Sequence, residues 1–564
     1  MKIAIRLGLL AAAILIFLSL NSSAYKGYFR DDGYDNAVWT PVTSLQEYVN
    51  AFFTPRFSPV NARPAGHYLV RVLRNTYDFD FPKWVAWIHI IHLANTVLIW
   101  LLARRLGASV AACAIGGAFF LVHAAIVEAV WQPMYVFDEL CALFCLLSLL
   151  LYHYQRYVLS FVAFWCAYKS KEPAVMLPVC VLAIELWFGG GKWWRPIPFF
   201  LVSLSFGLQA ILANRGAPQG TYALSLAPAD LWKTIYFYSS QIWLVPFFGL
   251  LILAVPFLER KRSVWFGLAL FGAALMPVLI LPNRISGAYL YLPLAGLAIA
   301  TANFAEGKPL LPVAIVLGLW FPFNIYHLFR NQTVLLRQAA ANRSYVQTLT
   351  AAARKLPPNT AYVYDSNPEQ FHFWGIQAVL RQTLNKSDAE IRLKAVDTSE
   401  GFQLLLDPNT AHLRWMPEQT RLNIVRRPPG APLKAFLDLN NNDDEWQLGE
   451  GWHAPLQGLR WAESFATVHL ERPSEAAEFE ITVDVVLRQL RKEGYVRMIL
   501  LHRPEVIANV ALERPGRQTL RWPVPAGRGG DIRLEILVEP PYIKLPDAAR
   551  PMGFRVASFG FVRK

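Results

Sequence analysis

The sequence predicts a polytopic α-helical membrane domain followed by an extracytoplasmic α/β segment and a β-sandwich. Hydrophobic residues make up 54% of the 564 residues, and the mean hydropathy of +0.29 is too high for an ordinary soluble enzyme. Apolar stretches long enough to span a bilayer recur as far as residue 328, and short alternating runs replace them in the C-terminal half. We therefore expect a membrane domain over 1–330, the α/β segment over 331–430 and the sandwich over 431–564.

The apolar stretches indicate about eleven transmembrane helices. They lie near residues 3–20, 84–103, 109–127, 139–155, 157–168, 173–190, 196–213, 241–258, 263–281, 288–303 and 309–328. The first stretch has a basic start and a Ser-Ser-Ala end, which are also typical of a cleaved signal peptide. We expect an uncleaved helix, because the residues that follow it make chemical sense only if they are held at the membrane surface.

The charge distribution predicts the topology. The net charge of +14 divides into +10 for residues 1–330 and +4 for the remainder, so the excess lies in the apolar half and reports membrane orientation instead of nucleic-acid binding. If the N-terminus is cytoplasmic, the inside loops carry almost only Lys and Arg, as the positive-inside rule requires. Eleven of the fourteen acids in this half then face outward, many of them at helix ends. Charge at a membrane edge is costly and marks candidate functional sites.

Two outside loops are too long to be simple connectors. The loop from Asn21 to Lys83 contains Leu45–Phe53, which we expect to form a short amphipathic helix on the bilayer surface. The loop from Arg215 to Gln241 contains the amphipathic stretch Ala227–Ser240, which could lie along the interface as a lid. These loops place polar and aromatic side chains where the acids gather.

After Arg330 the pattern predicts first a mixed segment and then strands. Thr333–Leu356 indicates a polar helix, and Tyr362–Arg392 a strand and a helix. The alternating runs that predict an antiparallel sandwich are Phe479–Val486, Val496–Leu501, Val506–Leu512 and Ile532–Val538. The cluster Asp438–Asp444 has the composition of a calcium loop, but it lacks the spacing of an EF-hand and indicates a turn. The five cysteines all lie in apolar runs and indicate buried small residues.

A pair of acids, Asp31 and Asp32, follows the first helix on the outer side, directly after Arg30. Two adjacent carboxylates at a membrane boundary can act as a general base toward an acceptor hydroxyl or hold a divalent metal such as Mg²⁺ or Mn²⁺, while the arginine keeps one of them ionised. The alternative is a solvated loop or a helix cap. Their position at the membrane boundary favours the functional interpretation.

These residues and a series of later blocks resemble the GT-C superfamily of membrane glycosyltransferases, within it the branch of the protein O-mannosyltransferases. That family places an acidic motif just after the first helix, where Asp31-Asp32 stands. The resemblance covers about residues 1–330. Its further blocks are Arg63-Pro64, His92-Leu93-Ala94-Asn95, Arg104-Arg105-Leu106-Gly107, His123 with Glu128-Ala129-Val130-Trp131, Lys169-Ser170-Lys171-Glu172-Pro173, and Arg284 with Tyr289-Leu290-Tyr291-Leu292-Pro293.

The resemblance implies transfer of a hexose-like sugar from a polyprenyl-phosphate donor to an extracytoplasmic acceptor, which is a glycan, a lipid or a protein. It implies Asp31 or Asp32 as the base, Glu128 and Asp138 as supporting acids, and Lys171, Arg284 and Arg63 as phosphate ligands. Arg30, Glu172 and Tyr289 complete the expected substrate site. Lys171 and Arg284 could instead be cations that snorkel from helix ends, and Glu172 could be a helix-start acid ahead of Pro173.

Two departures limit the carry-over from the family. The segment Met134–Asp138 lacks the arginine that many relatives have before the aspartate, and the C-terminal half lacks the Trp-Trp-Asp signature of oligosaccharyltransferases. A flippase, a polysaccharide ligase or polymerase, and a non-catalytic glycan-binding protein are the alternatives. A flippase would require charges in mid-helix or repeated halves, and neither is visible in the sequence.

The C-terminal strands resemble a jelly-roll module of bacterial surface-glycan proteins. Trp452 and Trp461 are then either sandwich core or a platform for a sugar. The expected location is the inner (plasma) membrane, with a cytoplasmic N-terminus and a periplasmic or extracellular C-terminal domain.

Overall fold

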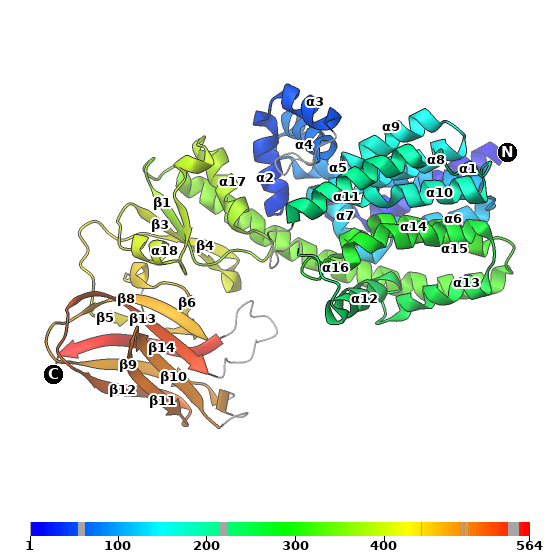
Figure 1. The fold of residues 1–564 in the computed structure, drawn as a ribbon. Coiled ribbons are helices and arrows are strands. Elements are labelled where there is room, and N and C mark those ends of the chain that lie inside the picture. The colour runs from blue at the N-terminus through cyan, green and yellow to red at the C-terminus, as the bar shows by residue number, and fades with distance from the viewer. Residues whose placement is uncertain are drawn as a thin grey trace. The chain divides into compact units, whose positions relative to one another are not determined.

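A computed structural model describes residues 2–54, 63–214, 223–440, 443–487, 489–490, 494–539 and 552–563. The chain forms two compact units, Met1–Ala339 and Ala340–Lys564. The first unit is helical and the second contains the strands (Figure 1). Asp443 and Asp444 of the predicted turn are described, whereas residues 441 and 442 of it lie outside the described residues.

The helical unit is a bundle of apolar helices with shorter amphipathic helices at one end (Figure 1). Its helices are α1 (Lys2–Leu20), α2 (Asp31–Trp39), α3 (Leu45–Phe53), α4 (Pro64–Tyr77), α5 (Phe81–Arg105), α6 (Val110–Leu121), α7 (Val127–Trp131), α8 (Val136–His153), α9 (Tyr157–Tyr168), α10 (Leu177–Trp187), α11 (Ile197–Asn214), α12 (Pro228–Ile242), α13 (Val255–Leu258), α14 (Arg262–Leu279), α15 (Tyr291–Ala305) and α16 (Leu310–Ala353). Short 3₁₀ turns join several of them, including η3 (Ala124–Ile126), η4 (Pro133–Tyr135), η5 (Glu172–Met176), η6 (Phe248–Ala254) and η7 (Gly287–Leu290).

Five helices of the described residues are long and apolar enough to cross a membrane, and a bent pair at 110–131 makes a sixth candidate. Shorter apolar helices lie at 11–20, 157–168, 197–209 and 248–258. The composition is that of a membrane protein. The expected number of about eleven spanning helices is not confirmed.

One expected span, 241–258, is wrong as a continuous helix. The chain leaves the helical conformation after α12 ends at Ile242, and Leu244 and Phe247 have positive φ angles of 61° and 63°. Pro246 lies between them and has no backbone N–H for a helical hydrogen bond. The segment then continues as the 3₁₀ helix η6 and the single turn α13.

The expected helices at 309–328 and 333–356 are a single helix. Residues 310–353 form α16 without a break, although Pro322 lies inside it. Asn324 explains part of its placement, since its side chain accepts from the Ala124 N–H at 2.9 Å and donates to the Val122 carbonyl at 2.7 Å. This buried amide satisfies backbone groups where α6 ends and η3 begins.

Small residues allow the central helices to pack closely. A Cβ atom on Gly267 of α14 would lie 2.4 Å from the Ala300 nitrogen of α15, and one on Gly116 of α6 would lie 2.3 Å from the Ala298 oxygen. Backbones approach in this way in membranes, where dispersion contacts and not apolar burial drive helix association. The pairs α14–α15 and α6–α15 therefore form the rigid centre of the unit.

The two ends of the bundle carry different chemistry. At one end, the loops expected inside bind one another: Ser109 N–H donates to Glu306 at 2.6 Å, Lys308 pairs with Glu259 at 3.1 Å, and Arg195 donates to the Tyr157 hydroxyl at 2.7 Å. The helices that leave these loops lead to the other end, where the acids expected outside lie. The separation of inside cations from outside acids that the sequence predicts is thus present along the bundle, whereas its orientation in the membrane stays a prediction.

The second unit begins with a small α/β layer. Strands β1 (Ala361–Tyr364), β2 (Leu393–Ala395), β3 (Thr410–Met416) and β4 (Arg421–Val425) form a sheet in the order β2-β1-β3-β4. The first three are parallel, and β4 is antiparallel to β3 at the edge. Helices α17 (Phe373–Leu384) and α18 (Ser399–Leu404) make the connections. The strand and helix predicted within Tyr362–Arg392 are confirmed.

Two antiparallel sheets follow and enclose one apolar core, so the predicted sandwich is confirmed as a fold. The first sheet has the order β11-β10-β13-β8 and the second β12-β9-β14-β7-β6, with β5 on β14. Their bounds are β5 (Phe436–Asp438), β6 (Trp452–Leu456), β7 (Leu459–Glu463), β8 (Phe465–Arg472), β9 (Ala477–Val485), β10 (Val496–His502), β11 (Glu505–Leu512), β12 (Gly516–Val524), β13 (Gly530–Glu539) and β14 (Met552–Arg563). Trp452 is fully buried in the core and Trp461 is partly buried, so Trp452 is no platform for a sugar.

Candidate active site

Arg30, Asp31 and Asp32 begin helix α2, at the end of the bundle that carries the acids. Arg30 is the N-cap residue and the two acids occupy the first turn, so the helix-start interpretation is correct as geometry. Asp31 is buried, and one of its carboxylate oxygens accepts the Asp32 N–H at 2.7 Å. Asp32 is partly exposed. Of the two carboxylates, Asp32 is therefore the one that an acceptor can reach.

Arg30 connects this turn to Glu128 of α7. The Arg30 guanidinium is buried and donates to a Glu128 oxygen at 3.2 Å and to the Gln338 side chain at 2.8 Å. The other Glu128 oxygen accepts the hydroxyls of Tyr135 and Ser286, each at 3.3 Å. Glu128 thus collects donors from three separate segments of the chain.

A second ion pair lies one helical turn further along the chain from Tyr135. The Lys171 ammonium contacts the Asp138 carboxylate of α8 at 2.5 Å, and both side chains are at least nine-tenths buried. The ammonium also lies 4.8 Å from the centre of the Tyr289 ring. Arg284 donates to the Tyr289 hydroxyl at 2.6 Å. A small cavity beside the pair is lined by Asp138, Lys171, Tyr289 and apolar side chains of α8, α14 and α15. Tyr289 thus contacts one cation with its ring and another with its hydroxyl.

A third pair joins the outer loop to η5. Arg63 reaches Glu172 through two parallel hydrogen bonds, of 2.9 and 3.0 Å, which is the bidentate geometry that fixes a guanidinium most firmly. The Arg63 guanidinium also lies over the Phe137 ring at 5.7 Å. His67, one turn into α4, packs edge-on against the same ring. Burial, with the nearby Arg63 charge, lowers the pKa of His67 to about 3, so this imidazole is neutral.

The three groups are one site because the chain joins them. Lys171 and Glu172 are adjacent residues, and Ser286 caps the short helix η7, which contains Tyr289. Close backbone approaches hold the segments together: a Cβ on Gly287 would lie 2.4 Å from the Ala125 oxygen, and Gly33 lies against Met134. The ten residues expected from the sequence thus lie in three groups of contacts that these segments connect.

The Glu172 carboxyl gives this site a pH dependence. Burial raises its pKa, but the charge and hydrogen bonds of Arg63 and the charge of Lys171 outweigh it and hold the pKa below the ordinary value of 4.5. A carboxyl with a depressed pKa stabilises the fold above its unfolded pKa, and this contribution is lost as the pH falls through the folded pKa.

We therefore expect Glu172→Gln to lower the melting temperature at pH 7 and to lower it less as the pH falls through the depressed pKa of the folded carboxyl, where the wild-type group becomes protonated as well. Thermal melts of both proteins across this range measure the difference. A difference that is equal at pH 7 and at pH 3 would contradict a contribution from the Arg63–Glu172 pair.

A divalent metal held by Asp31 and Asp32 would find no further His, Cys, Asp or Glu ligand among the described residues. Among the described residues, no group of three or more His, Cys, Asp or Glu side chains is arranged to hold a metal ion. The Asp31 carboxylate is moreover engaged with the backbone of its own helix turn. Within the part of the chain that the structure describes, no third side chain of these types completes a metal site at the pair, and no step of the chemistry is derived through a metal.

Sequence reasoning missed three uncharged members of the site. Tyr135 and Ser286 donate to Glu128, and Gln338 accepts from Arg30. Ser286 and Tyr135 lie within a few residues of Tyr289 and Asp138, so their position beside expected residues was the available signal. Gln338 lies in the part of α16 that follows the last apolar stretch, and nothing in its surroundings indicates a site.

No protein-family model and no curated protein matches this chain. Solved structures do resemble it. ArnT from Cupriavidus metallidurans, bound to undecaprenyl phosphate, is 13% identical, with a TM-score of 0.41 over 73% of this chain and 93% of that chain. The arabinofuranosyltransferase AftD from Mycobacteria is 11% identical, with a TM-score of 0.41 over 98% of this chain and 58% of that chain, and a mutant of AftD is 12% identical, with a TM-score of 0.41 over 98% and 61%. This chain thus spans less than two thirds of the length of AftD.

Proposed function

We propose that this protein is a membrane glycosyltransferase of the GT-C type that transfers a sugar from a polyprenyl-phosphate donor to an acceptor on the extracytoplasmic side. The observation that supports it most is the convergence of four cations and five carboxylates from six separate segments at one end of an apolar bundle. Ionic groups at a membrane edge are retained for function far more often than for stability. A charged lipid headgroup is the substrate that such a place can serve.

The reaction requires a proton acceptor and a place for phosphate. The acceptor hydroxyl attacks the anomeric carbon, its proton passes to a carboxylate, and the bond from the anomeric carbon to the phosphate oxygen breaks with its electron pair on the departing polyprenyl phosphate. Asp32 is the proposed base because it is the accessible acid of the pair. Asp31 and Arg30 position the turn that carries it.

Lys171, Arg284 and Arg63 are the proposed phosphate ligands. Their own partners orient them before the donor arrives: Asp138 holds Lys171, Tyr289 holds Arg284 and Glu172 holds Arg63. Preorganised donors stabilise charge that develops on a leaving group without reorganisation during the reaction. Lys171 and Arg284 both lie beside Tyr289, so they can meet the same phosphate.

The direct test is transfer by the purified full-length protein in lipid nanodiscs. The protein is incubated with a panel of hexosyl and pentosyl polyprenyl phosphates, with and without chelator, and the release of polyprenyl phosphate is measured. We expect release from one donor class that depends on an added glycan or lipid acceptor. Transbilayer movement of the intact donor without release of polyprenyl phosphate would replace the proposal by a flippase.

A further inference from the structure

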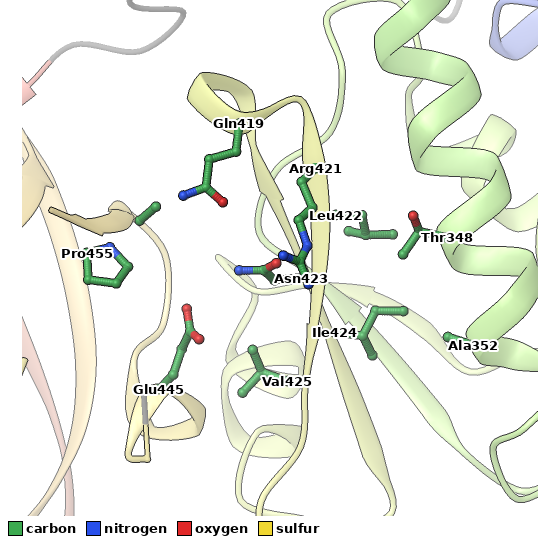
Figure 2. Close-up of a pocket in the computed structure, with 11 residues that line it drawn as sticks. Thr348, Ala352, Gln419, Arg421, Leu422, Asn423, Ile424, Val425, Glu445 and Pro455 are labelled. Atoms are coloured by element: carbon green, nitrogen blue, oxygen red, sulfur yellow. The ribbon is translucent and has the colours of Figure 1, made fainter. Parts of the chain in front are cut away.

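A polar groove lies in the second unit, between the edge of the α/β sheet and the edge of the sandwich. Its volume is about 590 Å³, and it is open to solvent. Its lining comes from the last turns of α16, from η9 (Pro417–Gln419) and β4, from Glu445, and from residues 454 and 455 of β6 (Figure 2). None of these residues belongs to the candidate active site.

The two walls of the groove are strand edges. β4 is the last strand of its sheet and β6 is the last strand of the second sandwich sheet. Five consecutive β4 residues, 421 to 425, line the groove, so backbone groups as well as side chains face it. The facing wall contains Pro455, which has no N–H to donate. A strand inserted between these walls could not pair fully with both.

The floor carries a fixed carboxylate, Glu445. The residue is 6% exposed, Arg460 contacts its Oε1 atom at 3.0 Å and Arg414 contacts the same atom at 3.5 Å. Figure 2 shows the carboxylate pointing into the groove, which Glu445 helps to line. Burial raises the pKa of Glu445, but the two guanidinium charges outweigh it and hold the pKa below the ordinary value, so the group is ionised at neutral pH.

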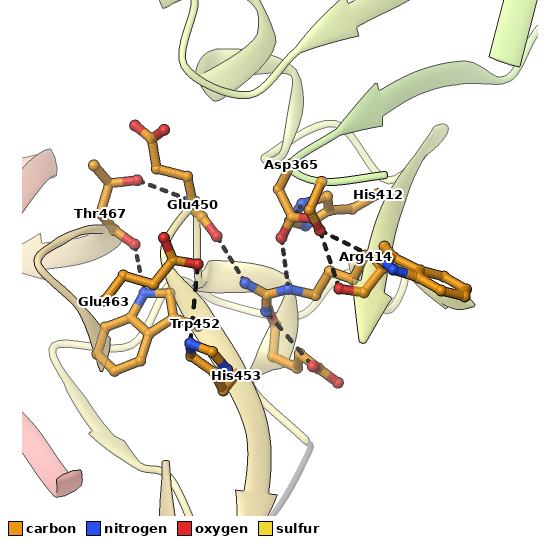
Figure 3. A network of polar contacts seen from close by, with 12 residues as sticks. Asp365, His412, Arg414, Glu450, Trp452, His453, Glu463 and Thr467 are labelled. Atoms are coloured by element: carbon orange, nitrogen blue, oxygen red, sulfur yellow. Dashed lines mark hydrogen bonds and ion pairs between the residues drawn. The ribbon is translucent and has the colours of Figure 1, made fainter. Parts of the chain in front are cut away.

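A buried network holds this carboxylate from behind. Arg414 also contacts Asp365 at 3.0 Å, and His412 lies 3.5 Å from the same aspartate (Figure 3). Asp365 ends the central strand of the sheet, and Arg460 comes from β7 of the sandwich. The alternation of acid and base from Asp365 through Arg414 and Glu445 to Arg460 leaves no net charge, so Glu445 cannot move without unpairing buried ions.

Hydrogen-bonding side chains line the groove around this carboxylate. Asn423 and Gln419 supply amides, and Arg421 supplies an exposed guanidinium (Figure 2). Apolar surface comes from Ile424, Val425 and Pro455. A few fixed polar groups on an apolar surface are the usual composition of a small-molecule site. One ionised acceptor beside amide donors matches neighbouring hydroxyls, each of which can donate and accept, and the arginine disfavours a cationic ligand.

We propose that this groove binds an uncharged oligosaccharide, with Glu445 accepting from one hydroxyl and Asn423 and Gln419 bridging the next. The assignment of this glycan as the acceptor of the transfer reaction rests on the proposed function. Binding itself does not, because the groove and the active site share no residue. An extended peptide is the alternative ligand. The glycan is favoured because Pro455 cannot donate a backbone hydrogen bond to a peptide strand, and because a carboxylate beside amides matches neighbouring sugar hydroxyls.

The experiment uses the full-length protein in nanodiscs and hexasaccharides of glucose, mannose, galactose and N-acetylglucosamine as probes, with binding followed by saturation-transfer NMR and calorimetry. We expect one of them to bind, and Asn423→Ala and Gln419→Ala each to weaken it at least tenfold at an unchanged melting temperature. Gln403→Ala on α18, an exposed glutamine outside the lining, is the matched control and should bind as the wild type does. Glu445→Gln should abolish binding. If the Glu445→Gln protein unfolds, the Asn423→Ala and Gln419→Ala variants alone test whether the groove binds the sugar.

Three results would overturn the proposal: no binding of any hexasaccharide, binding that the amide variants leave intact, or displacement of the sugar by an alternating Val-Thr peptide. The Asp32→Asn protein separates the two claims, since it should bind the hexasaccharide as tightly as the wild type. Binding without any transfer by the wild type would defeat the proposed function and leave the groove assignment standing.

Discussion

Replacing Asp32 with asparagine is expected to slow sugar transfer by about 10²- to 10⁴-fold, the usual contribution of a general base. Asparagine keeps the size and the helix-start position of the side chain but cannot take the acceptor proton. Because Asp32 is partly exposed and begins α2, we expect the variant to insert and fold as the wild type does. Initial rates of polyprenyl phosphate release, measured with saturating donor, give the effect on kcat.

Two further variants sharpen this result. Asp78→Asn changes another outer-loop aspartate, which is exposed at the end of α4, and should keep the wild-type rate. Asp31→Asn should reduce the rate and also the melting temperature, since the buried Asp31 carboxylate fixes the first turn of α2. Full activity in both single variants and in the double variant would falsify the assignment of the base to this pair.

The second large effect is expected for Lys171→Met. Lys171 and Asp138 have exposed side-chain fractions of 10% and 7%, so removal of the ammonium leaves a buried carboxylate without its cation. Breaking a buried pair in this way costs about 3–5 kcal/mol of stability. The variant should melt at a lower temperature and should also lose donor binding, because its phosphate ligand is gone.

A double variant separates the two losses. Lys171→Met with Asp138→Leu removes both charges and should recover much of the stability, since an apolar pair can replace a buried ion pair. It should not recover binding of the polyprenyl-phosphate donor, measured by its effect on tryptophan fluorescence. Lys83→Met, at an exposed pair with Asp80, is the surface control and should leave the melting temperature nearly unchanged. A double variant that transfers sugar at the wild-type rate would remove Lys171 from the site.

The sequence predicted helices well where local signals define their ends. Leu45–Phe53 has its expected bounds because Ser44 and Glu47 form a capping box. It predicted poorly where apolar composition continued through a break: residues 241–258 are hydrophobic throughout, yet the backbone around Pro246 turns. The opposite error occurs at α16, where the sequence predicted two helices and the structure has one. A change from apolar to polar residues does not by itself end a helix.

The candidate site shows the same limit. Charged residues at helix ends can be recognised as candidate site residues from the sequence, because charge is costly at a membrane edge. Which of these residues pair with one another cannot be recognised in this way. Arg63 binds Glu172 across 109 residues of sequence, and Lys171 binds Asp138 across 33, and no local pattern encodes either separation. Neutral partners such as Gln338 carry no charge signal at all. Close packing at Gly287 of η7 against Ala125 and at Gly33 of α2 against Met134 is likewise a tertiary feature without a local sequence signal.

Glu128 draws its donors from the segment after α1, from the start of α8, and from the turn before α15. These segments are delivered to the bilayer at different moments of synthesis, each by its own helix. A helix inserted upside down would carry its donor to the opposite surface and leave Glu128 unmatched. The contacts of this one carboxylate therefore require all three segments to lie at the same end of the bundle.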